Sequence, residues 1–160
     1  MSKNKVILAI SIAGLFVVIG CFIYFVSGIS STYPPIRKYE YQGSFNQLIT
    51  GIRNYTLRNA DVTFNITDTV GNKDNGYAIY LNIETKINQD SIEYDLKCED
   101  YNSNGIPNLT LISLIEAYNK TQNIGGYSKK AKGIDGLVNE FELNVLGFLK
   151  DNQKLHITPL

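Results

Sequence analysis

In the segment from Val62 to Cys98, apolar and polar residues alternate in three runs: VTFNIT at 62–67, IYLNIE at 79–84 and IEYDLKC at 92–98. Alternation with a period of two gives a strand one apolar and one polar face. Turn-forming residues separate the runs, at 71–76 and 88–91. We therefore expect an antiparallel meander with one buried face and one polar face.

Two further elements are expected before the meander. Residues 37–42 alternate charged side chains with two tyrosines and are predicted to form an edge strand. Ser44 is then a suitable N-cap, with Gln47 at the capping-box spacing. Apolar residues follow at helical intervals, which predicts a helix over 45–57.

The residues after the meander are expected to supply the helices that cover its apolar face. Residues 134–150 show the i, i+3, i+4, i+7 apolar spacing of a helix, whereas 106–119 fit a helix begun near Pro107 and a strand equally well. The glycine-rich and lysine-rich residues 125–133 are predicted to be a loop. The sequence therefore predicts an α+β fold, in which two or three helices cover one face of an antiparallel three- to four-stranded sheet.

An uncharged apolar segment, residues 6–29, precedes this domain. As a helix it would measure roughly 36 Å, enough to cross a bilayer core of about 30 Å. The lysines at positions 3 and 5 and the long chain that follows favour a cytoplasmic N-terminus. We predict a transmembrane signal-anchor at 1–29, a linker at 30–36 and an extracytoplasmic domain at 37–160.

The same segment allows a second interpretation, in which the N-terminus is cleaved. Residues 18–21, Val-Ile-Gly-Cys, resemble the lipobox of bacterial lipoproteins, which implies a mature protein that begins at an acylated Cys21. A lipobox cysteine is normally followed by polar residues, but here the apolar run continues through Val26. We favour the uncleaved anchor and keep the lipoprotein as the alternative.

The composition contains few residues that could support catalysis. The chain has 160 residues with 15 basic and 15 acidic side chains, and its formal net charge of zero argues against a nucleic-acid partner. The single imidazole is that of His156, and alternation places the thiol it could activate, Cys98, on the buried face. We therefore expect no catalytic residues, no cofactor and no metal centre.

Three carboxylates are candidates for a ligand-binding or hydrolytic alternative. Glu84, Glu93 and Asp95 should lie on the polar face of neighbouring strands, where a hydrolase could place a pair of acids. These are also positions at which a half-exposed sheet needs polar residues. We interpret them as surface residues and keep the alternative.

A short motif at Asp100–Asn108 is a candidate calcium loop. Its D-x-[DN]-x-[DN]-G pattern and Gly-Ile-Pro-Asn continuation resemble the calcium loops of thrombospondin type 3-like repeats, which implies calcium held by oxygen side chains. Asn stands in place of Asp at 102, 104 and 108, however, and Leu111 stands where the bidentate acid belongs. We interpret the motif as a turn, with weak calcium binding at Asp100–Gly105 as the alternative.

Lysines and tyrosines are the remaining candidates for binding. Lys129, Lys130 and Lys132, with Lys120 upstream, form a basic loop that could hold phosphate or lie on anionic headgroups. Eleven tyrosines without tryptophan fit either a binding surface or an AT-rich genome. The tyrosines left open for contact are Tyr39, Tyr41, Tyr80 and Tyr127.

These features together predict a single-pass membrane protein. Its domain outside the cytoplasm is expected to bind other envelope proteins, for example as an accessory subunit of a membrane complex, and to catalyse no reaction. The alternatives are a ligand-binding or hydrolytic domain that uses the polar sheet face, and a weak calcium-binding domain.

Overall fold

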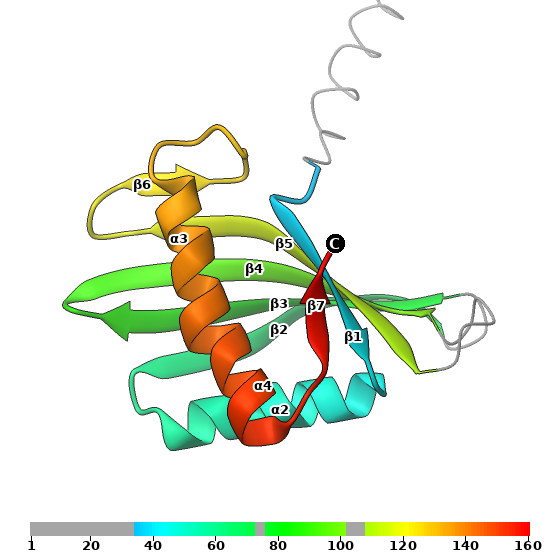
Figure 1. Ribbon diagram of the computed structural model, residues 1–160. Coiled ribbons are helices and arrows are strands. Elements are labelled where there is room, and N and C mark those ends of the chain that lie inside the picture. The colour runs from blue at the N-terminus through cyan, green and yellow to red at the C-terminus, as the bar shows by residue number, and fades with distance from the viewer. Residues whose placement is uncertain (1–33, 73–75, 102–107) are drawn as a thin grey trace, which may run out of the picture. The chain divides into compact units, whose positions relative to one another are not determined.

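The computed structural model describes residues 34–72, 76–101 and 108–160 (Figure 1). They belong to one compact unit of the chain, Tyr33–Leu160. No helix within these ranges is long and apolar enough to cross a membrane. The predicted anchor and the lipobox cysteine Cys21 lie outside the described residues, as does most of the calcium-like motif.

The domain contains an α+β arrangement of strands and helices. The strands are β1 (Arg37–Gln42), β2 (Val62–Asn72), β3 (Gly76–Ile87), β4 (Asp90–Asp100), β5 (Leu109–Asn119), β6 (Ile124–Gly126) and β7 (Ile157–Pro159). The helices are α2 (Phe45–Arg58), α3 (Ile134–Glu140) and α4 (Gly147–Gln153), and a π-helical segment η2 (Phe141–Leu146) joins the last two.

The strands form one sheet in the order β2-β3-β4-β5-β1-β7, with β6 paired to β5. Each pairing is antiparallel. The predicted alternation is observed in β3 and β4, whose apolar residues are buried at every second position, from Ile79 to Ile83 and from Ile92 to Cys98. In β2 it is only partly observed, because Val62 is buried but Ile66, at a register shift, is 49% exposed. The meander is thus confirmed, but the sheet has seven strands in the described chain, more than the three to four predicted.

Residues 109–119 form strand β5, so of the two interpretations left open for 106–119 the strand is confirmed and the helix is wrong. β5 pairs with β4 along one edge and with β1 and β6 along the other. β5 is a central strand of the sheet, and Ile112, Ser113 and Leu114 are buried in succession. Its apolar run therefore lacks the strict alternation that identifies a half-exposed strand.

β1 forms at the predicted residues, but it is not an edge strand. It pairs with β5 over its whole length and with β7 at residues 39–41. Its tyrosines, Tyr39 and Tyr41, are 1% and 2% exposed, so they belong to the core and not to a binding surface.

The helices cover a single face of the sheet (Figure 1). α2 begins at the predicted capping box, in which the Ser44 hydroxyl accepts from the Gln47 amide and the Gln47 side chain accepts from the Ser44 amide. α3, η2 and α4 follow one another directly, so helical structure extends from Ile134 to Gln153, slightly beyond the predicted end at residue 150.

Aromatic side chains fix the C-terminal helices to the middle of the sheet. The ring of Phe141 lies 5.1 Å from that of Tyr94 and 5.9 Å from that of Tyr39, between ring centroids. All three side chains are fully buried in the core. The opposite face of the sheet, called the outward face below, carries no helix in the described domain.

Candidate functional site

A cluster of polar side chains lies on the outward face, on β3, β4 and β5. The register places Asp95 between Asn82 and Glu116, and in the next row Glu93 lies beside Glu84. The prediction that Glu84, Glu93 and Asp95 share one polar face is therefore confirmed. We call the following residues the acidic cluster: Asn82, Glu84, Glu93, Asp95, Glu116 and Lys120.

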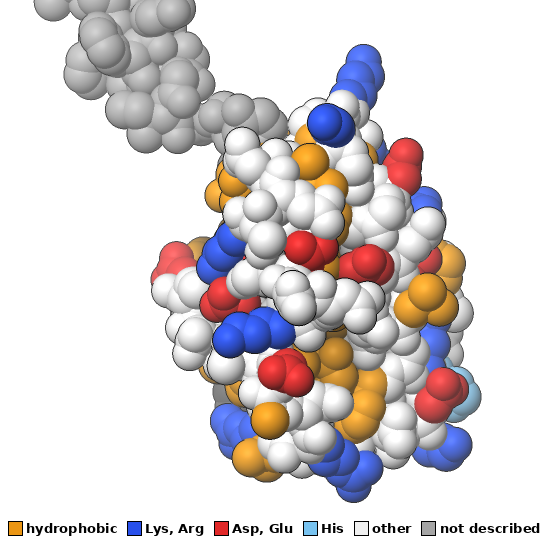
Figure 2. All heavy atoms as spheres, turned by 90° about the vertical axis from the view of Figure 1, so that its left-hand side faces the viewer, with side chains coloured by type: hydrophobic (Ala, Val, Ile, Leu, Met, Phe, Trp, Pro, Cys, Tyr) orange, Lys and Arg blue, Asp and Glu red, His pale blue; other side chains and the backbone are white. Residues whose placement is uncertain are grey.

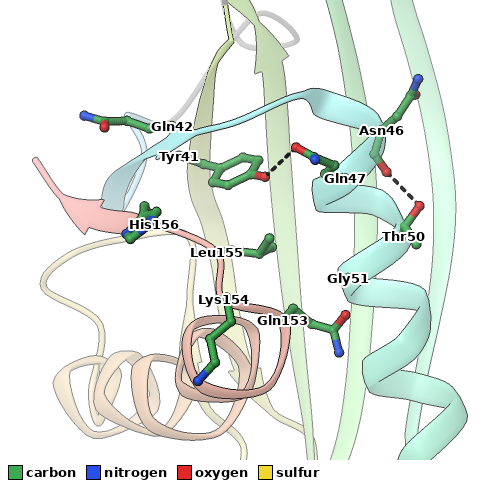
Figure 3. Close-up of a pocket in the computed structure, with 10 residues that line it drawn as sticks. All are labelled: Tyr41, Gln42, Asn46, Gln47, Thr50, Gly51, Gln153, Lys154, Leu155 and His156. Atoms are coloured by element: carbon green, nitrogen blue, oxygen red, sulfur yellow. Dashed lines mark hydrogen bonds between the residues drawn. The ribbon is translucent and has the colours of Figure 1, made fainter.

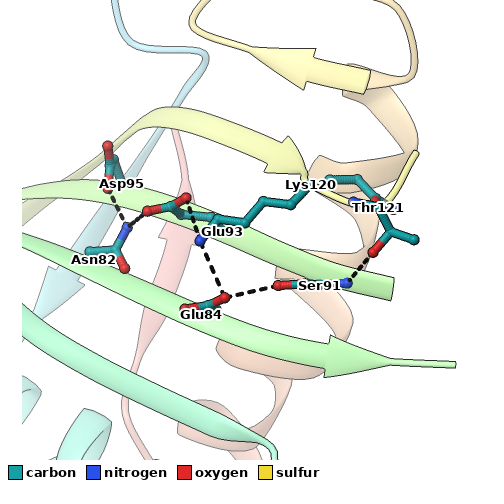
Figure 4. Close-up of polar contacts among 8 residues, drawn as sticks. Asn82, Glu84, Ser91, Glu93, Asp95, Lys120 and Thr121 are labelled. Carbon is teal, nitrogen blue, oxygen red and sulfur yellow. Dashed lines mark hydrogen bonds and ion pairs between the residues drawn. The ribbon is translucent and has the colours of Figure 1, made fainter. Parts of the chain in front are cut away.

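Hydrogen bonds and ion pairs hold the acidic cluster in one arrangement (Figure 4). The Asn82 amide donates to Oε1 of Glu93 at 2.5 Å and to Oδ1 of Asp95 at 2.7 Å. Nζ of Lys120 lies 3.1 Å from Oε2 of Glu93 and 3.2 Å from Oε1 of Glu84. Three carboxylates are thus oriented by neighbouring donors.

Negative charge is concentrated in the two rows of the cluster. Glu84 faces Glu93 and Asp95 faces Glu116, and like charges directly opposite each other destabilise a sheet. The ammonium group of Lys120 offsets the repulsion between Glu84 and Glu93. Hydrogen bonds from Ser91 and Lys120 lower the pKa of the Glu84 carboxyl, and the bond to Glu93 raises the pKa of the Lys120 ammonium.

Within the described part of the chain, no ion pair involves Glu116. Partial burial raises the pKa of its carboxyl, the charges of Asp95 and Glu93 raise it further, and the hydroxyl of Tyr127 partly offsets both effects. The pKa of the Tyr127 hydroxyl is raised to about 12, chiefly by its hydrogen bond to Glu116 and secondly by burial. This end of the cluster would therefore gain from an added positive charge.

The geometry of the acidic cluster suits a cationic group of a partner molecule. Within 34–72, 76–101 and 108–160, no set of three or more His, Cys, Asp or Glu side chains is arranged to hold a metal ion. Carboxylates on neighbouring strands do form charge-assisted hydrogen bonds with ammonium and guanidinium groups. Lys120 already makes such contacts with two of them.

The thiol and imidazole considered in the sequence lie apart. Cys98 is fully buried on the inner face of β4, and burial raises the pKa of its thiol to about 12. His156 is exposed and precedes β7, which β5 and β1 separate from β4. Three strand spacings amount to about 14 Å, too far for proton transfer between the two side chains.

A cleft of about 450 Å³ lies between the end of β1, the first half of α2 and the connection from α4 to β7 (Figure 3). Neutral side chains form much of its lining, including Asn46, Gln47, Thr50 and Gln153. The Tyr41 hydroxyl donates to Oε1 of Gln47 at 3.3 Å. Sequence patterns did not indicate this cleft, because the connection at residues 153–156 is distant in the chain from the two other walls, which belong to residues 41–51.

A second hollow, of about 480 Å³, lies between the end of α2, the end of β3 and η2. Leu143 on its rim is 75% exposed. Figure 2 views the domain from this end, where hydrophobic, acidic and basic side chains are interspersed.

The predicted group of four lysines is divided in the structure. Lys120 belongs to the acidic cluster, whereas Lys129, Lys130 and Lys132 lie exposed on the loop before α3. Of the remaining tyrosines, Tyr127 is 44% exposed.

Known proteins provide no assignment for these features. No family model, no curated protein and no solved structure matches this chain. Its function is therefore inferred from its own residues.

Proposed function

We propose that the protein is anchored in a membrane by residues 6–29 and that its domain, outside the cytoplasm, binds another envelope protein without catalysing a reaction. The uncharged apolar segment and the preceding lysines support the anchor. The observation that carries the binding role is the acidic cluster, a fixed set of carboxylates on the outward face.

The arrangement of the cluster favours recognition. Its side chains stand on three paired strands and are held by mutual hydrogen bonds, so a partner would lose little free energy in ordering them. Four carboxylates and one ammonium leave an excess of negative charge. The partner segment is therefore expected to present lysine or arginine.

A second candidate function is hydrolysis by a pair of acids. The observation that favours it is the position of Glu116 directly opposite Asp95, with a carboxyl pKa that burial raises, since two neighbouring carboxyls of unequal pKa can act as acid and base. The cleft and the second hollow are lined by other residues, however. Binding remains the better-supported role for a cluster on an open face of the sheet.

Purification from the host's own membranes tests the binding role. The full-length protein, tagged at its N-terminus, would be purified in detergent as wild type, as Asp95→Lys and as Asp151→Lys. The last variant is the matched control, since Asp151 is exposed on α4. We expect a stoichiometric partner with the wild type and the control, and its loss with Asp95→Lys.

Two outcomes would count against this proposal. A partner that binds Asp95→Lys as well as the wild type would show that the acidic cluster is not the contact. The second candidate would be favoured if the protein purified without a partner and had a hydrolytic activity that the Glu116→Gln variant lacked.

A further inference from the structure

The chain enters the domain beside the loop that carries three lysines, residues 127–133, here called the lysine loop. β1 pairs with β5 at residues 109–114, and β6 pairs with β5 at residues 117–119. β4 occupies the other edge of β5 along both stretches. β1 and β6 therefore lie end to end, and the start of β1 meets the end of β6 near Ile115 and Glu116 (Figure 1).

Cationic side chains gather at this corner. Five of them are exposed there: Arg37, Lys38, Lys129, Lys130 and Lys132. In the described chain, Arg37 has an ion-pair partner, Glu142 at 3.6 Å, and no ion pair involves the other four. The acids that face this corner are Glu116, Asp135 and Glu142, with Asp95 and Glu93 near Tyr127 at its edge, so the excess of positive charge is confined to the three lysines of the lysine loop.

Exposed apolar surface accompanies this charge. Tyr127 is 44% exposed at the start of the lysine loop, and Leu160 is 66% exposed where its amide donates to the Lys38 carbonyl at 3.0 Å. Tyrosine at the edge of a basic surface is typical of groups that lie at the level of lipid headgroups.

We propose that this corner, formed by the start of β1 and the lysine loop, lies against the membrane and binds anionic lipid headgroups. The inference rests on the anchor proposed above. The Ile36 amide donates to the Leu114 carbonyl at 2.8 Å, so the domain begins at Ile36. Residues 30–35 then form the tether, which extends at most roughly 20–25 Å from the end of the apolar segment.

A short tether and a basic corner act together. The tether keeps the corner within reach of the headgroups, so the lysines meet the surface at a high effective concentration. Lysines spread over an open loop match a layer of many phosphates better than one enclosed phosphate ion. The occupant is therefore the membrane surface itself.

Reconstituted full-length protein tests this inference. Spin labels would be attached at Gly136→Cys, beside the lysine loop, or at Asn152→Cys on α4, in a Cys21→Ser background. Both positions are exposed, and buried Cys98 should not react. Collisions with a nickel-chelating lipid would be measured in phosphatidylcholine vesicles with and without phosphatidylglycerol.

We expect the anionic lipid to increase collisions of the label at 136 and not of the label at 152. Changing Lys129, Lys130 and Lys132 to Gln should lower the ratio of docked to undocked domain about fivefold per lysine. The matched control changes three exposed lysines elsewhere, Lys86, Lys150 and Lys154, and should have no effect.

Failure of this inference can be separated from failure of the anchor. Protein removed from the vesicles by an alkaline wash would contradict the anchor. Protein that stays inserted but shows equal collisions in both lipids, or no change in the lysine-loop variant, would overturn the headgroup contact alone.

Discussion

Two buried tyrosines on the inner face of the sheet differ in what their hydroxyl groups contact. The Tyr39 hydroxyl donates to Oε1 of Glu142 at 2.9 Å. The Tyr94 hydroxyl is buried and has no hydrogen-bond partner among the described residues. Burial raises the pKa of both groups, so both are neutral at physiological pH. An unpaired buried hydroxyl costs free energy that a paired one does not.

We predict opposite effects when these hydroxyls are removed. Tyr94→Phe should raise the free energy of unfolding by about 1 kcal/mol, and Tyr39→Phe should lower it by about 1 kcal/mol. Urea denaturation of the two variants measures both values. A loss of stability in Tyr94→Phe would show that its hydroxyl does have a partner, such as a bound water.

The pKa of Glu116 predicts how stability depends on pH. This pKa is raised in the folded state, so the folded protein binds the proton more tightly than the unfolded chain does. The resulting gain in the free energy of unfolding is fully present below the ordinary carboxyl pKa, and it is lost as the pH rises through the raised pKa. Glu116→Gln should therefore be more stable than wild type by about 0.5 kcal/mol near pH 7 and equal to it near pH 4.

Glu84→Gln is the matched control with the opposite sign. The pKa of Glu84 is lowered, so its charged form stabilises the fold above the ordinary carboxyl pKa and this contribution is lost as pH falls. Glu84→Gln should be less stable than wild type near neutral pH. Equal effects of the two substitutions would contradict the charge distribution described for the cluster.

α3 packs closely on the hairpin of β5 and β6 at Gly125. Gly125 has a φ of +97°, and a Cβ there would lie 2.1 Å from the Ala117 carbonyl oxygen and 2.6 Å from Cδ1 of Leu137. Gly136 on α3 has no heavy atom within 4 Å of the equivalent position. The structure therefore has no room for a side chain at position 125, but it has room for one at position 136.

We predict that Gly125→Ala lowers the free energy of unfolding by more than about 2 kcal/mol, because backbone would have to move. Gly136→Ala should raise it by about 0.5–1 kcal/mol, since alanine favours the helix. Chemical denaturation compares the two directly. Similar values for both would show that the hairpin does not approach α3 as described.

Elements with strong periodicity could be predicted from the sequence, and the others could not. β3 and β4 alternate because one face is buried, and α2 has its capping box. β5 is a central strand, and its residues do not alternate strictly between buried and less buried positions. β6 and β7 contain three residues each and are defined by their partner strands, so no local pattern identifies them.

The candidate site could be predicted only in part, for the residues that lie on strongly periodic strands. Glu84, Glu93 and Asp95 follow from alternation within the meander. Glu116 and Lys120 belong to β5 and its end, where the sequence did not distinguish strand from helix, so their approach to the cluster could not be foreseen. The proximity of β1 to the lysine loop could not be predicted either, because it depends on the pairing of β6 with β5.

Extraction from membranes distinguishes the proposed anchor from the lipoprotein alternative. Full-length protein in host membranes should resist alkaline extraction, and Cys21→Ser should resist it equally, because an apolar helix needs no acyl chain. Intact mass spectrometry should find residue 1 or 2 at the N-terminus. Release of Cys21→Ser from the membrane would establish the lipoprotein.

Photo-crosslinking in the host cell tests whether the outward face of the sheet contacts a partner. A photoreactive residue would replace Tyr118, beside Glu93 on the outward face, or Asn139, exposed on α3. We predict one discrete crosslinked protein from position 118 and none from position 139. Crosslinks from position 139 alone, or from neither position, would contradict a partner bound at the acidic cluster.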